Sequence, residues 1–220
     1  MDSEAWLIIR FTLGMAALST LLVTPIGTVT AWLLAKKRWP GKSLVETLIF
    51  LPLVIPPVAT GLLLLKVFSR NGLLGGFLTK QLGLEVIFTW RAVVIAMVVM
   101  AFPLFVRTAR VAFEAVPVRL EQVGRTLGAS PLRVWFTITL PLARNGILAG
   151  MVMGFARALG EFGATILVAG NIPGKTTTIA VVIYNNIQLG QDEIALMYVL
   201  VSIIIAFICT WVGEYLCRRP

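Results

Sequence analysis

Histidine is absent from this chain of 220 residues, and cysteine occurs only twice, as Cys209 and Cys217 near the end of the last apolar segment. Without histidine there is neither a Cys/His metal site nor a nucleophile activated by histidine. Two cysteines also cannot build the disulfide framework of a small secreted domain. The sequence therefore predicts no metal site, no cofactor bound by this chain and no catalytic machinery of its own.

Charged residues are also scarce, at 13%, whereas hydrophobic residues make up 58% of the chain. The mean hydropathy of +0.92 is far above that of a soluble domain. The net charge of +9 comes from bases that flank apolar segments. Bases in such positions indicate membrane topology and give no sign of nucleic-acid binding. We therefore expect one membrane domain over residues 1–220.

Five apolar segments are long enough to cross about 30 Å of hydrocarbon as helices. They cover approximately residues 5–35, 44–68, 90–113, 142–169 and 194–216. The expected fold is therefore an all-α membrane protein with about five transmembrane helices. Membrane lipid surrounds such a fold.

Lysine and arginine are unevenly divided between the two sides that these spans define. One side holds Lys36, Lys37, Arg38, Lys42, Arg107, Arg110, Arg119, Arg125, Arg133, Arg144, Arg218 and Arg219. The other side holds Lys66, Arg70, Lys80, Arg91 and Lys175. The positive-inside rule places the first set in the cytoplasm, the N-terminus outside and the C-terminus inside. We also expect a short surface helix within the outer loop 71–85, whose glycines are interspersed with a Leu/Phe pattern.

The cytoplasmic connection over residues 114–141 is charged and unusually long for a link between two helices. Its chemistry predicts helix, turn, helix. Pro117 favours a helix start, Gly128 fits a left-handed turn, and Ser130 followed by Pro131 favours the start of a second helix. One face of the first helix carries Leu120, Val123 and Leu127. The expected product is a short amphipathic knob at the membrane surface, on which a soluble partner could push.

This connection resembles the EAA loop of ABC-importer permeases. Gly128 is followed by nine residues and then by Ile138, Thr139, Leu140 and Pro141, as in that loop, although Gln122 and Val123 replace its usual two alanines. The resemblance implies docking into an ATP-hydrolysing subunit, with ATP and Mg bound by that partner. The matching positions are Glu121, Gly124, Leu127, Gly128, Ala129, Ser130, Pro131, Ile138, Leu140 and Pro141. The alternative is an ordinary loop with accidental spacing.

Two spans carry signals for a translocation path. Pro52, Pro56 and Pro57 should break the second span, and freed carbonyls at membrane depth require a water-filled cavity or protein around them. The alternative is a structural kink. The fourth span carries Arg157 and Glu161 four residues apart, where unpaired charges would be costly. Candidate wall residues around this pair are Gly160, Gly163 and Thr165. These features predict an anion path, and the alternative for the charged pair is a role in helix packing only.

Three stretches together resemble the permease subunit of a molybdate ABC importer, within the molybdate, tungstate and sulfate branch of binding-protein-dependent permeases. They are FLPLVIPPVATG, RTLGASPLRVWFTITLPL and FARALGEFGATILVAGNIPGKTTTI. The resemblance implies a type I importer fold in a prokaryotic inner (plasma) membrane. It also implies a homodimer of this chain, two cytoplasmic ATP-binding subunits and an external or periplasmic oxyanion-binding protein. Molybdate is the expected cargo, with tungstate or sulfate as alternatives. A secondary transporter or a membrane assembly protein is a further, less favoured possibility.

Overall fold

The computed structural model of the chain describes residues 3–218, with side chains up to residue 215. Every secondary-structure element in this range is a helix. The elements are α1 (Ser3–Lys36), α2 (Lys42–Val54), α3 (Pro57–Phe68), α4 (Leu73–Leu82), α5 (Trp90–Ala115), α6 (Val118–Thr126), α7 (Pro131–Val134), the π-helical turn η1 (Trp135–Thr139), α8 (Leu140–Leu159), α9 (Gly163–Ala169), α10 (Ile179–Gln188) and α11 (Asp192–Arg218).

Four helices are long and apolar enough to cross a membrane, namely α1, α5, the continuous run from α7 through α8, and α11. Helices α2 and α3, with a bend of 114° between them, are long and apolar enough to make a fifth span when the pair is taken together. The predicted all-α fold with about five spans is confirmed. The predicted break in the second span is also confirmed, because α2 ends at Val54 and α3 begins at Pro57.

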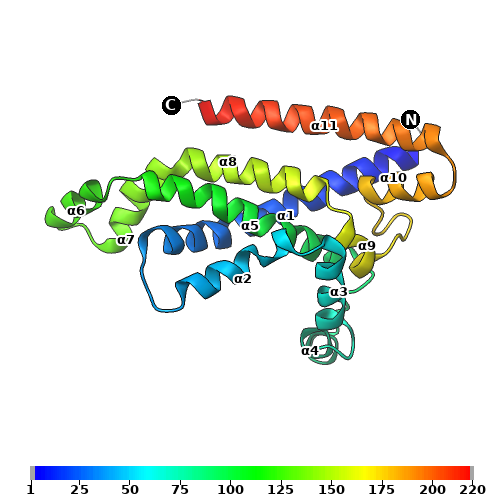
Figure 1. Cartoon of the computed structure of the whole chain (residues 1–220), viewed down its shortest axis with the longest axis horizontal. Coiled ribbons are helices and arrows are strands. Elements are labelled where there is room, and N and C mark those ends of the chain that lie inside the picture. Colours follow the sequence, from blue (N-terminus) through cyan, green and yellow to red (C-terminus); the bar gives the residue numbers. More distant parts are fainter. Residues whose placement is uncertain (1–2, 219–220) are drawn as a thin grey trace.

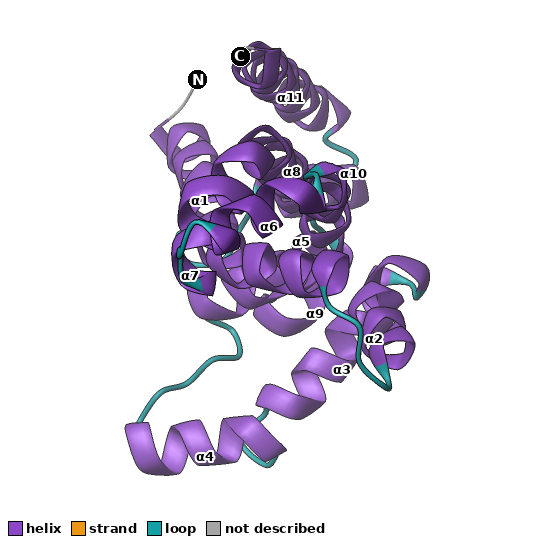
Figure 2. Ribbon diagram, turned by 90° about the vertical axis from the view of Figure 1, so that its left-hand side faces the viewer, coloured by secondary structure: helices purple, strands orange, loops and turns teal. Residues whose placement is uncertain are grey.

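The long helices α1, α5 and α8 lie side by side as the centre of the molecule, and α11 lies along one edge (Figure 1). In the perpendicular view, α11 stands apart from this centre, and α2, α3 and α4 project on another side (Figure 2). The surface of α11 is largely exposed in the isolated chain. The knob helices α6 and α7 lie at one end, whereas α9 and α10 lie at the other (Figure 1).

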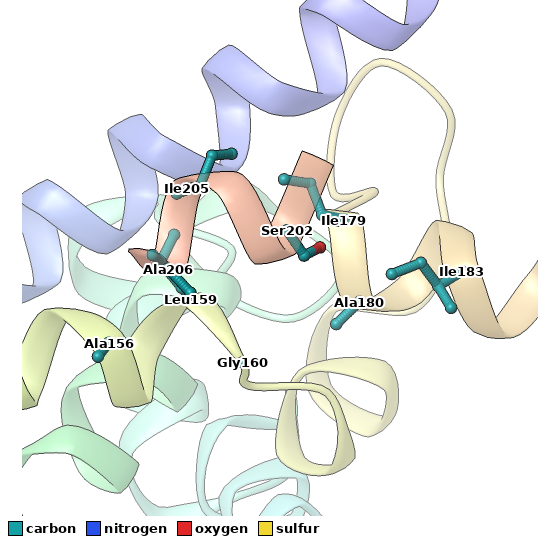
Figure 3. Close-up of a pocket in the computed structure, with 9 residues that line it drawn as sticks. All are labelled: Ala156, Leu159, Gly160, Ile179, Ala180, Ile183, Ser202, Ile205 and Ala206. Atoms are coloured by element: carbon teal, nitrogen blue, oxygen red, sulfur yellow. The ribbon is translucent and has the colours of Figure 1, made fainter. Parts of the chain in front are cut away.

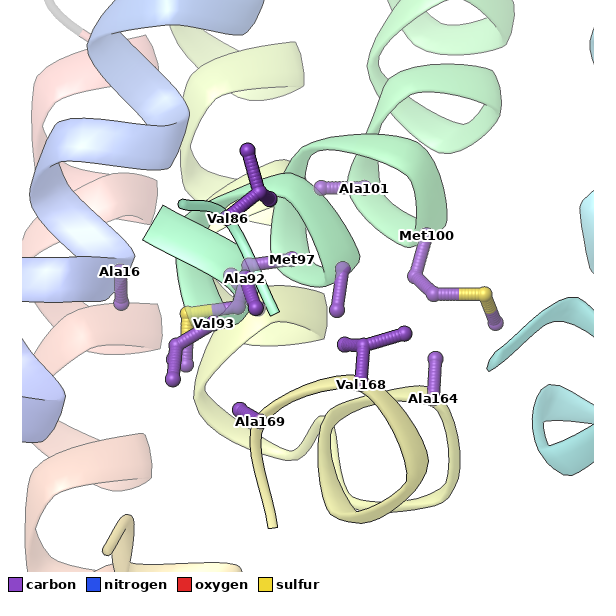
Figure 4. Packing of buried hydrophobic residues seen from close by; sticks show 12 residues of the cluster. Ala16, Val86, Ala92, Val93, Met97, Met100, Ala101, Ala164, Val168 and Ala169 are labelled. Carbon is purple, nitrogen blue, oxygen red and sulfur yellow. The ribbon is translucent and has the colours of Figure 1, made fainter. Parts of the chain in front are cut away.

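Small residues let the central helices approach one another closely. The ring of Phe105 on α5 is fully buried between glycines, since a Cβ on Gly27 of α1 would lie 2.5 Å from it and a Cβ on Gly150 of α8 3.2 Å. Further along α5, Met97 and Met100 pack towards Ala164 and Val168 of α9 (Figure 4). Because lipid tails are as apolar as these side chains, close van der Waals contact is what holds such helices together.

The fourth apolar segment differs from the single span expected over residues 142–169. Helix α8 ends at Leu159, and α9 begins at Gly163 after a short irregular stretch. A short helix is present within residues 71–85 as expected, namely α4, and an ion pair between Arg70 and Glu85 joins the chain on either side of it. Its place on the outer membrane surface stays a prediction. The orientation of the chain in the bilayer stays a prediction.

Candidate functional site

The knob of residues 117–141 has the helix–turn–helix geometry that its sequence predicts. Helix α6 ends in a left-handed turn at Gly128, whose φ is 86°. The amide of Gly128 donates to the Arg125 carbonyl (3.0 Å), and that of Ala129 donates to the Gly124 carbonyl (3.1 Å). This pair of bonds satisfies carbonyls that the helix end leaves free. Ser130 then caps α7 by accepting from the Arg133 amide, and Pro131 is the first residue of α7.

Several large apolar side chains of the knob are exposed, among charged and polar ones. Leu127 is 82% exposed and Leu132 is 71% exposed, although both are large aliphatic residues. The remaining exposed apolar residues of this face are Val118, Leu120, Val123 and Phe136. We call these six residues the apolar knob face. An apolar patch on an otherwise charged loop is typical of a surface that another protein covers.

Glu121, the acidic residue of the knob, points away from this face and into the chain. Its Oε1 accepts from the Thr139 hydroxyl (2.8 Å) and lies 3.5 Å from Lys36 Nζ. Lys36, the last residue of α1, also donates to the Val116 carbonyl at the end of α5 (2.7 Å). The Glu121 and Lys36 side chains are only 14% and 11% exposed. This network, which we call the Lys36 latch, ties the knob to α1, α5 and η1.

Gly124 brings the two halves of the knob together. A Cβ at this position would lie 2.8 Å from Ile138 Cδ1 and 3.2 Å from Val134 Cγ2, so any larger residue would require these two side chains to shift. The second half of the knob continues without interruption through η1 into α8, where Leu140 and Pro141 are the first residues. A displacement of the knob would therefore act directly on a membrane-spanning helix.

The two broken spans meet at their breaks. A Cβ on Gly163, the first residue of α9, would lie 2.8 Å from the Pro57 Cβ at the start of α3. A Cβ on Gly61 would lie 2.8 Å from the Ala164 Cα. Half-helices α3 and α9 are thus in backbone contact, which places two of the sequence-predicted path residues side by side. Pro52 lies within α2, and Pro56 is the exposed N-cap of α3.

Arg157 and Glu161 form the ion pair that their spacing predicts, with Arg157 Nη1 2.7 Å from Glu161 Oε2. Glu161 lies beyond the end of α8, which closes at Gly160. Its other carboxylate oxygen accepts from the Ala164 amide (2.7 Å), so Glu161 joins α8 to the first turn of α9. Glu161 is 1% exposed and Arg157 is 24% exposed. The pair is therefore asymmetric in its access to solvent.

The remaining predicted path residues have different surroundings. Thr165 is fully buried in α9, and its hydroxyl has no hydrogen-bond partner among the described residues. Gly160 lies at the edge of a pocket of about 270 Å³ where α8, α10 and α11 meet (Figure 3). The side chains around this pocket are aliphatic apart from Ser202. It therefore offers an oxyanion little to bind.

The sequence did not reveal the contacts made by Lys36, Thr139 and Gly61. Lys36 was visible only as one base among the topology signals, and its partner lies far along the chain in α6. The π-helical turn was also not predicted. A signal for it existed in Pro141, which lacks an amide hydrogen for the helical ladder directly after this turn.

The arrangement of helices defines a class of protein. The fold matches one chain of the crystal structure of a bacterial alginate ABC transporter in complex with an alginate-bound periplasmic protein, with a TM-score of 0.77. The match covers 100% of this chain and 80% of that chain at 19% sequence identity. The expected fold of an ABC-importer permease is thereby confirmed.

The sequence places the chain within this class. The model of the family described as "Binding-protein-dependent transport system inner membrane component" matches residues 24–220, and the chain belongs to this family. The chain is therefore a multi-pass protein of a prokaryotic inner membrane.

Two curated relatives are similar over nearly the whole chain. The molybdenum transport system permease protein ModB of Haemophilus influenzae is 47% identical over 212 residues, which is 96% of this chain and 93% of the relative. The protein of the same name from Escherichia coli K12 is 46% identical over 214 residues, or 97% and 93%. The resemblance inferred from the sequence motifs is confirmed by these relatives.

Proposed function

We propose that this chain is the membrane-spanning subunit of an ATP-driven importer that moves molybdate into the cytoplasm. Family membership and the two molybdenum permease relatives support the cargo. The observation that carries the mechanism is the knob, in which an exposed apolar face is joined rigidly to α1, α5 and α8. A rigid knob can transmit a push to the spans, whereas a flexible linker would absorb it.

In this proposal the apolar knob face docks on an ATP-binding subunit, one beneath each copy of the chain. ATP and Mg bind to that partner, and hydrolysis takes place there. The docking residues are those predicted from the sequence: Glu121, Gly124, Leu127, Gly128, Ala129, Ser130, Pro131, Ile138, Leu140 and Pro141. The geometry divides their roles. Leu127 offers contact area, Gly128 to Pro131 set the turn, and Glu121, Gly124 and Ile138 hold the knob together.

The path itself is proposed to lie between two copies of this chain, with an external binding protein delivering the oxyanion. The exposed apolar surface of α11 in the isolated chain is compatible with such an assembly. Broken helices belong where backbone lines a cavity or is covered by protein. Pro52, Pro56, Pro57 and Gly160 are the predicted path residues that retain exposure. Glu161, Gly163 and Thr165 support the wall from behind, and Arg157 lies between the two groups.

Tungstate and sulfate are the alternative cargoes, because all three are doubly charged tetrahedral oxyanions. The test is uptake of labelled molybdate into proteoliposomes that hold this chain, its ATP-binding subunit and its binding protein. Unlabelled molybdate should abolish ATP-dependent accumulation, and sulfate at the same concentration should have a much weaker effect. Accumulation driven by an ion gradient without ATP would instead identify a secondary transporter.

A further inference from the structure

A second pocket, which is polar, lies between the knob and the end of α1. It has a volume of about 280 Å³ and is formed by the end of α1, by α6 and by the α7–η1 turn. We call it the inner pocket and define it by Trp32, Lys37, Gln122, Arg125 and Trp135, which line it together with the Lys36 latch. The apolar knob face contributes only Val118 to it.

The inner pocket carries positive charge that the chain does not neutralise. Lys36 is compensated there by Glu121. Lys37 and Arg125, in contrast, form no ion pair among the described residues, and Lys37 Nζ lies 5.6 Å from the centre of the Trp32 ring. Two basic side chains around one pocket favour an anionic ligand.

One residue that lines the same pocket, Trp135, carries a hydrogen-bond donor without a partner. The indole Nε1 of Trp135 is buried and has no partner among the described residues. Its ring is held by edge contacts with Trp32, at 6.3 Å between ring centres, and with Phe136, at 4.6 Å. A buried N–H without an acceptor is destabilising, so such a group calls for a partner. A group with several acceptor oxygens could contact both bases, and also the Trp135 N–H once the indole ring turns this closed-off atom toward the pocket.

The depth of the pocket indicates where such a ligand comes from. Helix α1 has 34 residues and is therefore about 50 Å long, against roughly 30 Å of hydrocarbon. It therefore extends about 20 Å beyond the hydrocarbon, and we take its last turns, from Trp32 to Lys36, as the end that reaches the lipid headgroups. Tryptophan is typical of this interface, and basic pockets between membrane helices on the cytoplasmic side bind anionic headgroups.

We propose that the inner pocket binds the phosphate group of an anionic phospholipid, such as phosphatidylglycerol, from the adjacent leaflet. Lys37 and Arg125 neutralise the phosphate, and Trp135 donates a hydrogen bond to one of its oxygens. A zwitterionic lipid fits less well, since its own ammonium group already compensates the phosphate. The bound headgroup would join the end of α1 to the knob beside the Lys36 latch. This site is independent of the transported cargo.

The test is native mass spectrometry of the purified full-length chain with phosphatidylglycerol or phosphatidylethanolamine added at equal concentration. The wild type should retain phosphatidylglycerol in preference. Trp135→Phe, which removes the N–H together with one of the two fused rings of the indole, should weaken retention by about tenfold. Lys37→Gln/Arg125→Gln should weaken it by about tenfold or more. The control Lys66→Gln/Lys80→Gln removes the same charge from exposed positions at the other end and should leave retention unchanged.

Competition with free inorganic phosphate distinguishes a site for a lipid headgroup from a site for a soluble phosphate ion. At millimolar concentration it should not displace phosphatidylglycerol, because it lacks the apolar anchor. Displacement by phosphate that depends on Trp135 would mean a soluble-anion site and would overturn the lipid assignment. Equal retention of phosphatidylglycerol by the wild type and both pocket variants would overturn the site itself. Neither result would bear on transport of molybdate.

Discussion

At the scale of single residues, substitution of Arg157 and substitution of Glu161 should differ in their cost to stability. Glu161 is almost fully buried, whereas Arg157 retains a quarter of its exposure. Arg157→Gln would leave a buried carboxylate uncompensated, which costs about 3–5 kcal/mol in protein interiors. Glu161→Gln keeps an acceptor oxygen for the Ala164 amide and leaves the charge on the more exposed partner.

We therefore expect Arg157→Gln to reduce the amount of folded, membrane-inserted protein more than Glu161→Gln does. The double substitution should restore part of the loss, since it leaves no unpaired charge. Size-exclusion profiles and thermal unfolding of the purified variants provide the measurement. The two single variants could instead lose equal amounts of folded protein, with the loss in the double variant equal to their sum. That result would show that the two side chains do not depend on each other.

The Lys36 latch gives a second prediction at this scale. Lys36→Gln should leave the Glu121 carboxylate with the Thr139 hydroxyl but no cation, remove the donor to the Val116 carbonyl, and destabilise the knob by about 1–3 kcal/mol. Arg38→Gln removes the same charge two residues on, from an exposed side chain, and serves as the control. The measurements are the rate at which a protease cleaves the knob in membranes and the rate of ATP-dependent uptake. Lys36→Gln should be cleaved faster and transport less than Arg38→Gln. Equal behaviour would mean that Lys36 acts only as a topology signal.

At the scale of elements, the knob was predictable almost residue by residue because the residues that determine its turn and its second helix start are close together in the sequence. The left-handed turn needs Gly128, and the second helix needs Ser130 followed by Pro131, all within four positions. The break at Pro56 and Pro57 was predictable for the same reason. The break between α8 and α9 was not, because it depends on distant contacts. Glu161 bonds across it, and Gly163 fits against Pro57 more than one hundred residues earlier.

The contact between α3 and α9 can be tested with a matched pair of glycine substitutions. Gly61→Ala would place a Cβ 2.8 Å from the Ala164 backbone, and overpacking of this kind costs about 1–3 kcal/mol. Gly14→Ala makes the same chemical change on α1, where nothing lies within 4 Å. We expect a lower thermal unfolding temperature for Gly61→Ala alone. An unchanged temperature would mean that α3 and α9 are not in contact.

At the scale of the whole molecule, the distribution of bases predicts the N-terminus outside and the knob inside. With Cys209 and Cys217 replaced by serine, a cysteine at Ser3 should react with an impermeant reagent in intact cells. A cysteine at Ser130 should react only after the membrane is opened. The reverse pattern would place the knob on the wrong side for a cytoplasmic ATP-binding subunit.

Transmission of force through the knob is the central claim, and one substitution tests it most directly. Gly128→Val disfavours the left-handed turn by more than about 1 kcal/mol, yet no atom of the chain lies within 4 Å of a Cβ at this position, so within the chain the change acts through the backbone alone. Gly128→Asn is the matched control, because asparagine tolerates that conformation. The measurement is ATP-driven molybdate uptake by the reconstituted complex. The account predicts a sharp loss of uptake and of ATPase association for Gly128→Val, and activity close to wild type for Gly128→Asn. Normal coupled transport by Gly128→Val would contradict it.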